Sequence, residues 1–255
     1  MRLTSHKGFG LFATQDIPRG TCIVTEPSLI TVPPSEPDCE HIWKAFKNLK
    51  SEQHDHVCGL FVPTTVNSCL SGHVRRKLLR HQYTSVSLIA AVEDELKMRT
   101  VFSSNCMDMG FNGQYGQGLF LIASRLQHSC VPNVQQGYNA TLKMSTVYVT
   151  RDVKEGEELT RSYIQHVYND YEQRADLLSR WNFKCDCVAC LGPQAALRER
   201  RLRRITEHVT GLEMYDMGAG SFAAPSGPRE AVAWAEEVVG LMKMQGVDDL
   251  ELARA

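Results

Sequence analysis

Three cysteines, separated by one and by two residues, form the segment of this sequence with the clearest chemical character. Cys185, Cys187 and Cys190 place three thiols within six residues. A closed structural zinc site takes four tetrahedral ligands, so this segment would supply three of them. Three buried free cysteines are the alternative, but the intervening Asp186 fits a buried strand poorly. The segment therefore predicts a metal site that needs one more ligand from elsewhere in the chain.

Two other segments contain residues of a type that could supply the fourth ligand. His54, His56 and Cys58 alternate with other residues in a ligand-like pattern, which fits a polar segment of the helical middle region better. Cys130 lies in residues 127–133, which read Gln-His-Ser-Cys-Val-Pro-Asn. On the residues alone both candidates stay open, and the setting of Cys130 favours it.

Residues 127–133 also invite interpretation as a hydrolase nucleophile, because His128, Ser129 and Cys130 follow one another. Side chains of sequence neighbours point in different directions, however. The members of a catalytic triad meet through space rather than along the chain. We therefore reject that interpretation.

Composition excludes several other classes of protein. The chain has 255 residues, a formal net charge of -1 and an odd number of cysteines, nine. The charge argues against a nucleic-acid binder, and no apolar run approaches the ~18 residues of a membrane span. The apolar run at residues 8–13 is too short for a signal peptide. We expect an intracellular protein with reduced thiols, in which clustered cysteines indicate metal.

Periodicity predicts strands at both ends of a helical middle region. Glycine-rich turns flank short strands at 11–13 and 21–25, and strands recur between 141 and 164. Helical spacing of apolar residues marks the region 41–102. Further helices are expected beyond the cysteines, with apolar stripes formed by Leu202, Ile205, Val209 and Leu212, and by Val232, Ala235, Val239 and Met242.

Four motifs in this order resemble the SET-domain protein lysine methyltransferases. They are residues 7–13 (Lys-Gly-Phe-Gly-Leu-Phe-Ala), 128–133, 156–163 (Gly-Glu-Glu-Leu-Thr-Arg-Ser-Tyr) and 183–190, which contains the three cysteines. The helical middle region and the cysteines are similar to the branch of SET-and-MYND proteins and their fungal relatives. The MYND zinc finger itself has no counterpart here. The resemblance extends from about residue 6 to residue 191.

The resemblance implies an α+β fold, in which small β-sheets surround a threaded, pseudoknot-like core. We expect a SET domain at 1–164 with a helical insertion at about 33–102. A zinc-binding post-SET segment follows at 165–191, and then a C-terminal helical region at 192–255. A last helix that begins near Leu250 has no room to finish, which suggests an abbreviated form of a longer chain.

The resemblance also implies the activity, which is transfer of a methyl group from S-adenosylmethionine to a lysine side chain of a histone or another protein. Tyr163 is the expected catalytic residue. The four zinc ligands would be Cys130, Cys185, Cys187 and Cys190. The expected cofactor-binding residues are Lys7, Gly8, Phe9, Gly10, Asn105, Gln127, His128, Tyr163, Trp181 and Phe183. For Trp181, a plain core role is an equal alternative.

Two residues depart from the family pattern. Gln127 stands where the family usually has Asn, and Arg161 occupies a position that is commonly apolar. Together with the short C-terminal region, they motivate the alternative of a weak or inactive SET-fold interaction module that binds cofactor and zinc. A plain zinc scaffold is a third reading, but it leaves the other three motifs unexplained. The basic run 198–204 is interpreted as the solvated face of a helix rather than a nucleic-acid site.

Beyond the activity, we expect a monomer without membrane attachment, located in the nucleus, the cytoplasm or both. Its partner would be a protein with an accessible lysine. The sequence leaves open the substrate protein, the lysine, the degree of methylation and the role of the C-terminal region.

Overall fold

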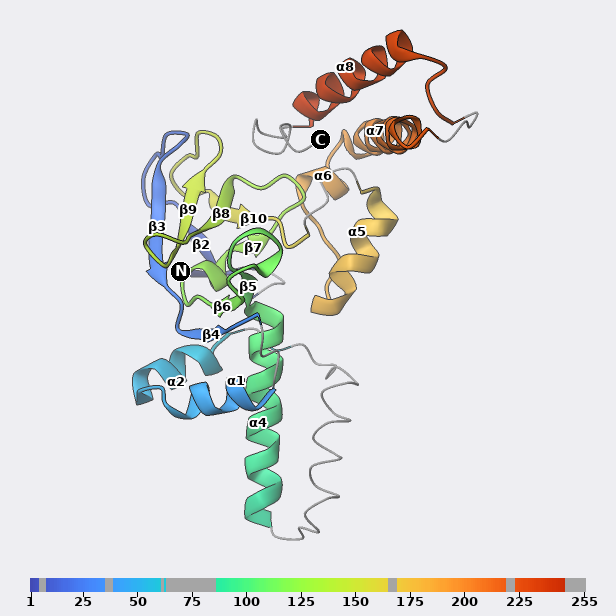
Figure 1. Ribbon diagram of the computed structural model, residues 1–255. Coiled ribbons are helices and arrows are strands. Elements are labelled where there is room, and N and C mark those ends of the chain that lie inside the picture. Colours follow the sequence, from blue (N-terminus) through green and yellow to red (C-terminus); the bar gives the residue numbers. More distant parts are fainter. Residues whose placement is uncertain are drawn as a thin grey trace. The chain divides into compact units, whose positions relative to one another are not determined.

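The computed structural model describes residues 1–4, 8–34, 39–60, 62, 86–164, 169–218 and 223–245. The chain divides into two compact units. The first unit comprises Met1–Gln127, Asn133–Thr160 and Arg180–Asn182, and the second comprises His128–Pro132, Arg161–Ser179 and Phe183–Ala255. Each unit is described by itself, with element labels as in Figure 1.

Small β-sheets make up much of the first unit, as the α+β prediction requires. One has the strand order β1-β2-β10-β7, in which β1 is Arg2–Thr4, β2 Gly8–Phe12, β10 Glu158–Arg161 and β7 Gln127–His128. In this sheet β2 pairs antiparallel with both β1 and β10. Another has the order β3-β9-β8, with β3 at Cys22–Pro27, β9 at Met144–Val149 and β8 at Val134–Asn139. The last has the order β4-β6-β5, with β4 at Ile30–Val32, β6 at Gln117–Leu119 and β5 at Met107–Asp108. The 3-10 turns η1 (Phe111–Gly113) and η2 (Ala123–Arg125) link strands.

The helices of the middle region pack on one of these sheets. They are α1 (Cys39–Lys47), α2 (Ser51–Cys58) and α4 (Val86–Asn105), which lie together in Figure 1. Their apolar side chains share a core with β4 and β6, formed by Ile30, Val32, Phe46, Val57, Leu60, Met98, Val101, Phe102 and Leu119. The helical prediction for residues 41–102 is therefore confirmed where the chain is described. A separate core fills the space between the sheets, and includes Phe120, Leu126, Val147 and Leu159.

The second unit is mainly helical. Its elements are α5 (Tyr171–Leu178), α6 (Val188–Leu191), α7 (Ala195–Asp216) and α8 (Pro228–Met244), and η3 (Ser179–Trp181) begins in it. A capping box starts α5, because the Asp170 carboxylate accepts from the Gln173 amide N–H and the Gln173 side chain accepts from the Asp170 N–H, each at 2.9 Å. Pro228 at the first position of α8 is pre-set for a helix start.

Helices α7 and α8 pack against each other through Ile205, Val238 and Met242. The predicted stripe on α7 is confirmed, with Leu202 and Ile205 buried. The predicted stripe on α8 is confirmed only at Met242, which is buried, and is wrong at Val232 and Val239, which are 59% and 38% exposed. Apolar residues lie on more than one side of α8, so its period alone does not select the buried side.

A glycine permits the close approach of these two helices. A Cβ atom at Gly211 would lie 2.4 Å from the Ala223 carbonyl oxygen and 2.5 Å from the Trp234 ring. Among the helices that the structure describes, none has both the length and the apolar character needed to cross a membrane.

Candidate functional site

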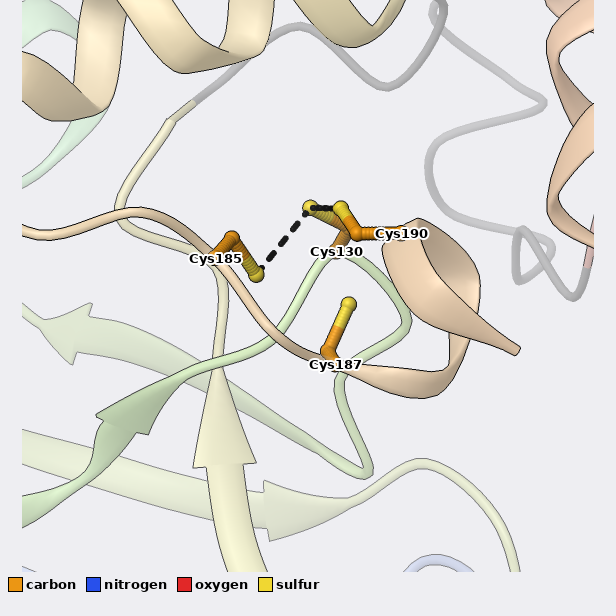
Figure 2. Close-up of side chains that lie close together, drawn as sticks. All are labelled: Cys130, Cys185, Cys187 and Cys190. Atoms are coloured by element: carbon orange, nitrogen blue, oxygen red, sulfur yellow. Dashed lines mark hydrogen bonds between the residues drawn. The ribbon is translucent and has the colours of Figure 1, made fainter. Parts of the chain in front are cut away.

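The four predicted cysteine ligands meet in the second unit. Their sulfur atoms all lie within 4.8 Å of one another, and Figure 2 shows them directed toward a common centre. The Cys130 sulfur is 3.8 Å from that of Cys185 and 3.6 Å from that of Cys190. A tetrahedral zinc ion with Zn–S bonds of about 2.3 Å separates its sulfurs by about 3.8 Å. The donor set and its spacing therefore fit zinc.

Local backbone structure places these thiols. Cys130 follows β7, in a loop whose Ser129 N–H donates to the Arg161 carbonyl oxygen at 3.0 Å. Cys187 is the residue that precedes α6, and its carbonyl accepts from the Cys190 N–H at 2.9 Å. This helical turn brings the side chains of Cys187 and Cys190 to one side. Among the described residues, these four cysteines are the group of His, Cys, Asp or Glu side chains whose ligand atoms lie close enough to hold a metal ion.

The alternative ligands at residues 54–58 are used differently. They lie on α2, where the His54 ring packs on Phe46 with centroids 4.1 Å apart, and Cys58 is exposed. His54 and Cys58 share a helix face, but His56 points away from them. Among the described residues, these three side chains do not form a cluster of metal ligands.

The crowded thiols perturb one another strongly. A hydrogen bond with Cys130 is the main cause that lowers the pKa of Cys190 to about 7, and it also lowers the pKa of Cys187. The pKa of Cys130 is raised, mainly through its hydrogen bond with Cys185. Adjacent thiols cannot all ionise without a counter-charge, so a divalent cation would be needed for all four to be thiolates.

Two arginines lie beside the cysteine cluster. Arg174 on α5, 3% exposed, places Nη2 at 3.7 Å from the Cys190 sulfur and at 2.6 Å from the Glu199 carboxylate. Burial opposes the charge of Arg174, but Glu199 and the thiolate charge raise its pKa above the ordinary value. Arg198 donates to the Cys130 carbonyl oxygen at 3.2 Å and to the Gln245 side chain at 2.6 Å. Both cations would offset the negative charge that a zinc tetrathiolate carries.

Arg174 and Arg198 were not singled out as site residues by sequence. Arg174 lies on the same face of α5 as Tyr171 and Leu178. A charged residue on the apolar face of a predicted helix was the sequence signal that could have indicated a buried arginine. Arg198 belongs to the basic run 198–204, which was interpreted as solvated. The structure separates Arg198 from the exposed members of that run, such as Arg200 and Arg203.

The predicted aromatic residues of the second unit form a cluster next to the cysteines. The His128 ring centroid is 5.4 Å from that of Tyr163 and 6.0 Å from that of Phe183, and Tyr163 and Phe183 meet edge to face at 6.4 Å. The structure therefore brings together three of the predicted site residues. His128 is almost fully buried, with 1% of its surface exposed.

Arg161, one of the departures from the family pattern, lies against Tyr163. Its guanidinium carbon is 4.6 Å from the Tyr163 ring centroid, a cation–π distance. The side chain is half-buried. The Arg161 guanidinium therefore packs on the ring of the tyrosine that was expected to be catalytic.

In the first unit, Phe9, Gly10 and Gln127 come together. The Gln127 side-chain N–H donates to the Phe9 carbonyl oxygen at 2.9 Å. A Cβ atom at Gly10 would lie 2.6 Å from a Glu158 carboxylate oxygen, so close packing within the sheet requires this glycine. Gly8 differs, because it has a φ of +80° and open space where a side chain would be. Lys7 lies outside the described residues.

Asn105 and Trp181 form another group in the first unit. Asn105 ends α4, and its side-chain N–H donates to the Val101 carbonyl oxygen at 2.8 Å. The indole N–H of Trp181 donates to the carbonyl oxygen of Ser104, the residue before Asn105, at 2.8 Å. Both residues are buried. This hydrogen bond fixes the Trp181 indole against the end of α4.

Comparison with known proteins identifies the fold that carries these residues. The sequence model described as "SET domain" matches residues 8–164. The chain belongs to the SET-domain family. The expected α+β SET fold is thereby confirmed.

Curated relatives of this SET-domain chain lie in the expected branch. It is 29% identical over 204 residues to the histone-lysine N-methyltransferase set5 of Schizosaccharomyces pombe, covering 79% of this chain and 51% of that protein. It is 24% identical over 196 residues to the SET domain-containing protein L678 of Acanthamoeba polyphaga mimivirus, covering 73% and 74%. It is 34% identical over 77 residues to the mouse histone-lysine N-methyltransferase SMYD3, covering 30% and 18%. The chain thus spans about half of the yeast relative.

Proposed function

We propose that this SET-domain chain transfers methyl groups from S-adenosylmethionine to a lysine side chain of a protein substrate. The observation that carries the proposal is the cluster of Tyr163 with His128 and Phe183, three motif residues of the family, beside the four cysteines. Membership of the family and the names of the curated relatives support the reaction class.

The residues proposed to bind S-adenosylmethionine follow from the family motifs. The open space at Gly8 supports this assignment, since a ligand can approach the backbone there without meeting a side chain. Phe9, Gly10, Asn105, Gln127, His128, Trp181 and Phe183 are proposed with it, and Lys7 belongs to the same motif. When bound, S-adenosylmethionine supplies the methyl group on a positively charged sulfonium.

Tyr163 is proposed as the catalytic residue. Its hydroxyl would orient the attacking lysine amine, and alignment of the reacting atoms supplies much of the rate in a displacement of this kind. The amine must be neutral to attack. A cation disfavours a second positive charge nearby, so the Arg161 guanidinium on the Tyr163 ring would lower the pKa of the incoming amine.

The four cysteines are proposed to hold one structural zinc ion. All four coordination positions are then occupied by the chain, which leaves none for substrate. The role of the ion would be to hold Cys130 against the segment 185–190.

Substrate and location are proposed from the relatives alone. Two of them carry histone-lysine methyltransferase names, so histones are the first substrates to test, and a nuclear or cytoplasmic location is proposed on the same ground. Proteins other than histones belong in the same test.

The test is transfer of a labelled methyl group to histones and to proteins of a cell extract. We expect Tyr163→Phe to lower the rate by about 10²-fold or more, because the amine loses its orienting hydroxyl. Tyr148→Phe is the matched control, since Tyr148 is 45% exposed on β9. Equal labelling by the wild type and Tyr163→Phe would remove Tyr163 from the mechanism.

A catalytically inactive interaction module is the second candidate: in it the Arg161 guanidinium, 4.6 Å from the Tyr163 ring centroid, blocks the lysine amine instead of lowering its pKa. Calorimetry with S-adenosylmethionine separates the two. Binding of the cofactor without transfer to any protein supports the module, whereas absence of binding refutes the cofactor assignment in both.

A further inference from the structure

His128 has a contact with a named residue at each of its two ring nitrogens. The backbone N–H of Tyr163 lies 3.1 Å from Nδ1, and the Cys130 sulfur lies 3.4 Å from Nε2. A backbone N–H can only donate, so Nδ1 is the acceptor. The proton of the neutral ring therefore belongs on Nε2, where it points to the sulfur.

The surroundings of His128 hold this arrangement in place. The ring is 1% exposed and is flanked by the rings of Tyr163 and Phe183. The backbone bond from Ser129 to Arg161 ties the two segments that carry Cys130 and Tyr163. In such a buried setting water does not compete for these hydrogen bonds.

We propose that His128 is a positioning residue that couples occupancy of the four-cysteine centre to the placement of Tyr163. This inference rests on the proposed function and deepens it. A metal-bound thiolate is a fixed acceptor for the Nε2 proton, which leaves Nδ1 as the acceptor for Tyr163. Partners of this kind orient ligands, and they also set metal affinity.

Without metal, the Cys130 sulfur is no longer held by a central ion. The Nε2–H then loses its fixed acceptor, and the orientation of the ring relative to Tyr163 is less constrained. Zinc at a site that does not touch substrate would in this way affect the catalytic tyrosine.

Two substitutions separate the two contacts. In His128→Asn, the side-chain oxygen can take the position of Nδ1 and accept from Tyr163, but no donor reaches the sulfur. In His128→Gln, the amide nitrogen can take the position of Nε2 and donate to the sulfur, but the acceptor for Tyr163 is lost. His56→Gln is the control, because His56 is exposed on α2.

The metal end is measured by chelator competition and by cobalt substitution of the full chain. We expect His128→Asn to weaken zinc binding by about 10–100-fold and to shift the sulfur-to-cobalt charge-transfer bands. His128→Gln and His56→Gln should stay close to the wild type. An Asn variant with unchanged affinity and spectrum would overturn the proposal.

The tyrosine end is measured by fluorine NMR of the full chain labelled with 3-fluorotyrosine, with the Tyr163 resonance assigned through Tyr163→Phe. We expect zinc removal to shift the Tyr163 resonance in the wild type and to have much less effect in His128→Gln. The Tyr148 resonance reports whether the rest of the chain is disturbed. If the Tyr163 resonance of the wild type does not shift when zinc is removed, the coupling is refuted.

Methyl transfer provides the link to function. We expect His128→Gln to lower kcat by more than it changes the KM for S-adenosylmethionine, although its zinc is retained. Full kcat in zinc-loaded His128→Gln would contradict the proposal. If the wild type transfers no methyl group, the proposed function fails, while the cobalt spectra and the Tyr163 resonance still decide the coupling.

Discussion

The Arg174 guanidinium lies 3.7 Å from the Cys190 sulfur and 2.6 Å from the Glu199 carboxylate, so one buried cation joins α5 and α7 to the cysteine cluster. A zinc ion with four thiolates carries two negative charges. A buried charge of that size is stable only when cations or hydrogen-bond donors surround it. Substitution of Arg174 therefore tests how the surroundings of the cluster, and not only its ligands, affect metal binding.

Removal of that cation should weaken the metal centre. We expect Arg174→Met to lower zinc affinity by about 10–100-fold in chelator competition, because the thiolate of Cys190 loses a charged donor. Arg200→Met is the matched control, since Arg200 is exposed on α7. Equal affinities for the two variants would show that Arg174 does not stabilise the bound metal.

Loss of the fourth ligand should release zinc and destabilise the chain. The freshly purified wild type should contain one zinc per chain, and Cys130→Ser should contain much less and melt at a lower temperature. Metal binding to such a site contributes directly to folding free energy. Cys22→Ser, at an exposed cysteine, should retain both zinc and stability. Full zinc content in Cys130→Ser, by elemental analysis, would refute the ligand set.

Acid should release zinc from the wild type, because protons compete with the metal for thiolate ligands. The hydrogen bond with Cys130 lowers the pKa of the Cys190 thiol to about 7. That thiol is therefore partly ionised near neutral pH and is protonated as the pH falls. Zinc content measured after equilibration from pH 8 to pH 5 should decline, and constant content across this range would argue against thiolate ligation.

Arg161 should influence the pH dependence of methyl transfer. If its guanidinium lowers the pKa of the substrate amine, Arg161→Leu should shift the rising limb of the pH–rate profile to higher pH. Arg203→Leu, at an exposed position, serves as the control. A gain of activity at every pH in Arg161→Leu would instead indicate that Arg161 obstructs Tyr163.

The packing of α7 on α8 predicts opposite effects at two glycines. Gly211→Ala should lower the free energy of unfolding by about 1–3 kcal/mol, because its Cβ would meet the Ala223 oxygen and the Trp234 ring. Gly240→Ala should raise it by about 0.5–1 kcal/mol, since nothing lies within 4 Å of the added atom and alanine favours a helix. Denaturant unfolding measures both, and equal effects would contradict the close approach.

The spacing of residues along the sequence by itself predicted a metal site, several helices and the family of this protein. The spacing of Cys185, Cys187 and Cys190 indicated a metal site, because a single turn brings such neighbours together whatever the rest of the fold. Helical periodicity predicted the helices of the middle region and the buried side of α7. The order of the four motifs identified the SET family and, through it, Tyr163 and Cys130 as residues to examine.

Only the tertiary structure decided which distant residues meet. Spacing along the chain does not reveal that Cys130 lies 3.8 Å from Cys185, that Arg174 reaches Cys190, or that Arg161 covers Tyr163. The buried side of α8 was likewise set by its packing against α7, since apolar residues on several sides leave the period ambiguous. These outcomes depend on contacts between residues far apart in sequence. Such contacts form only when the whole chain folds and their free energy offsets the loss of conformational entropy.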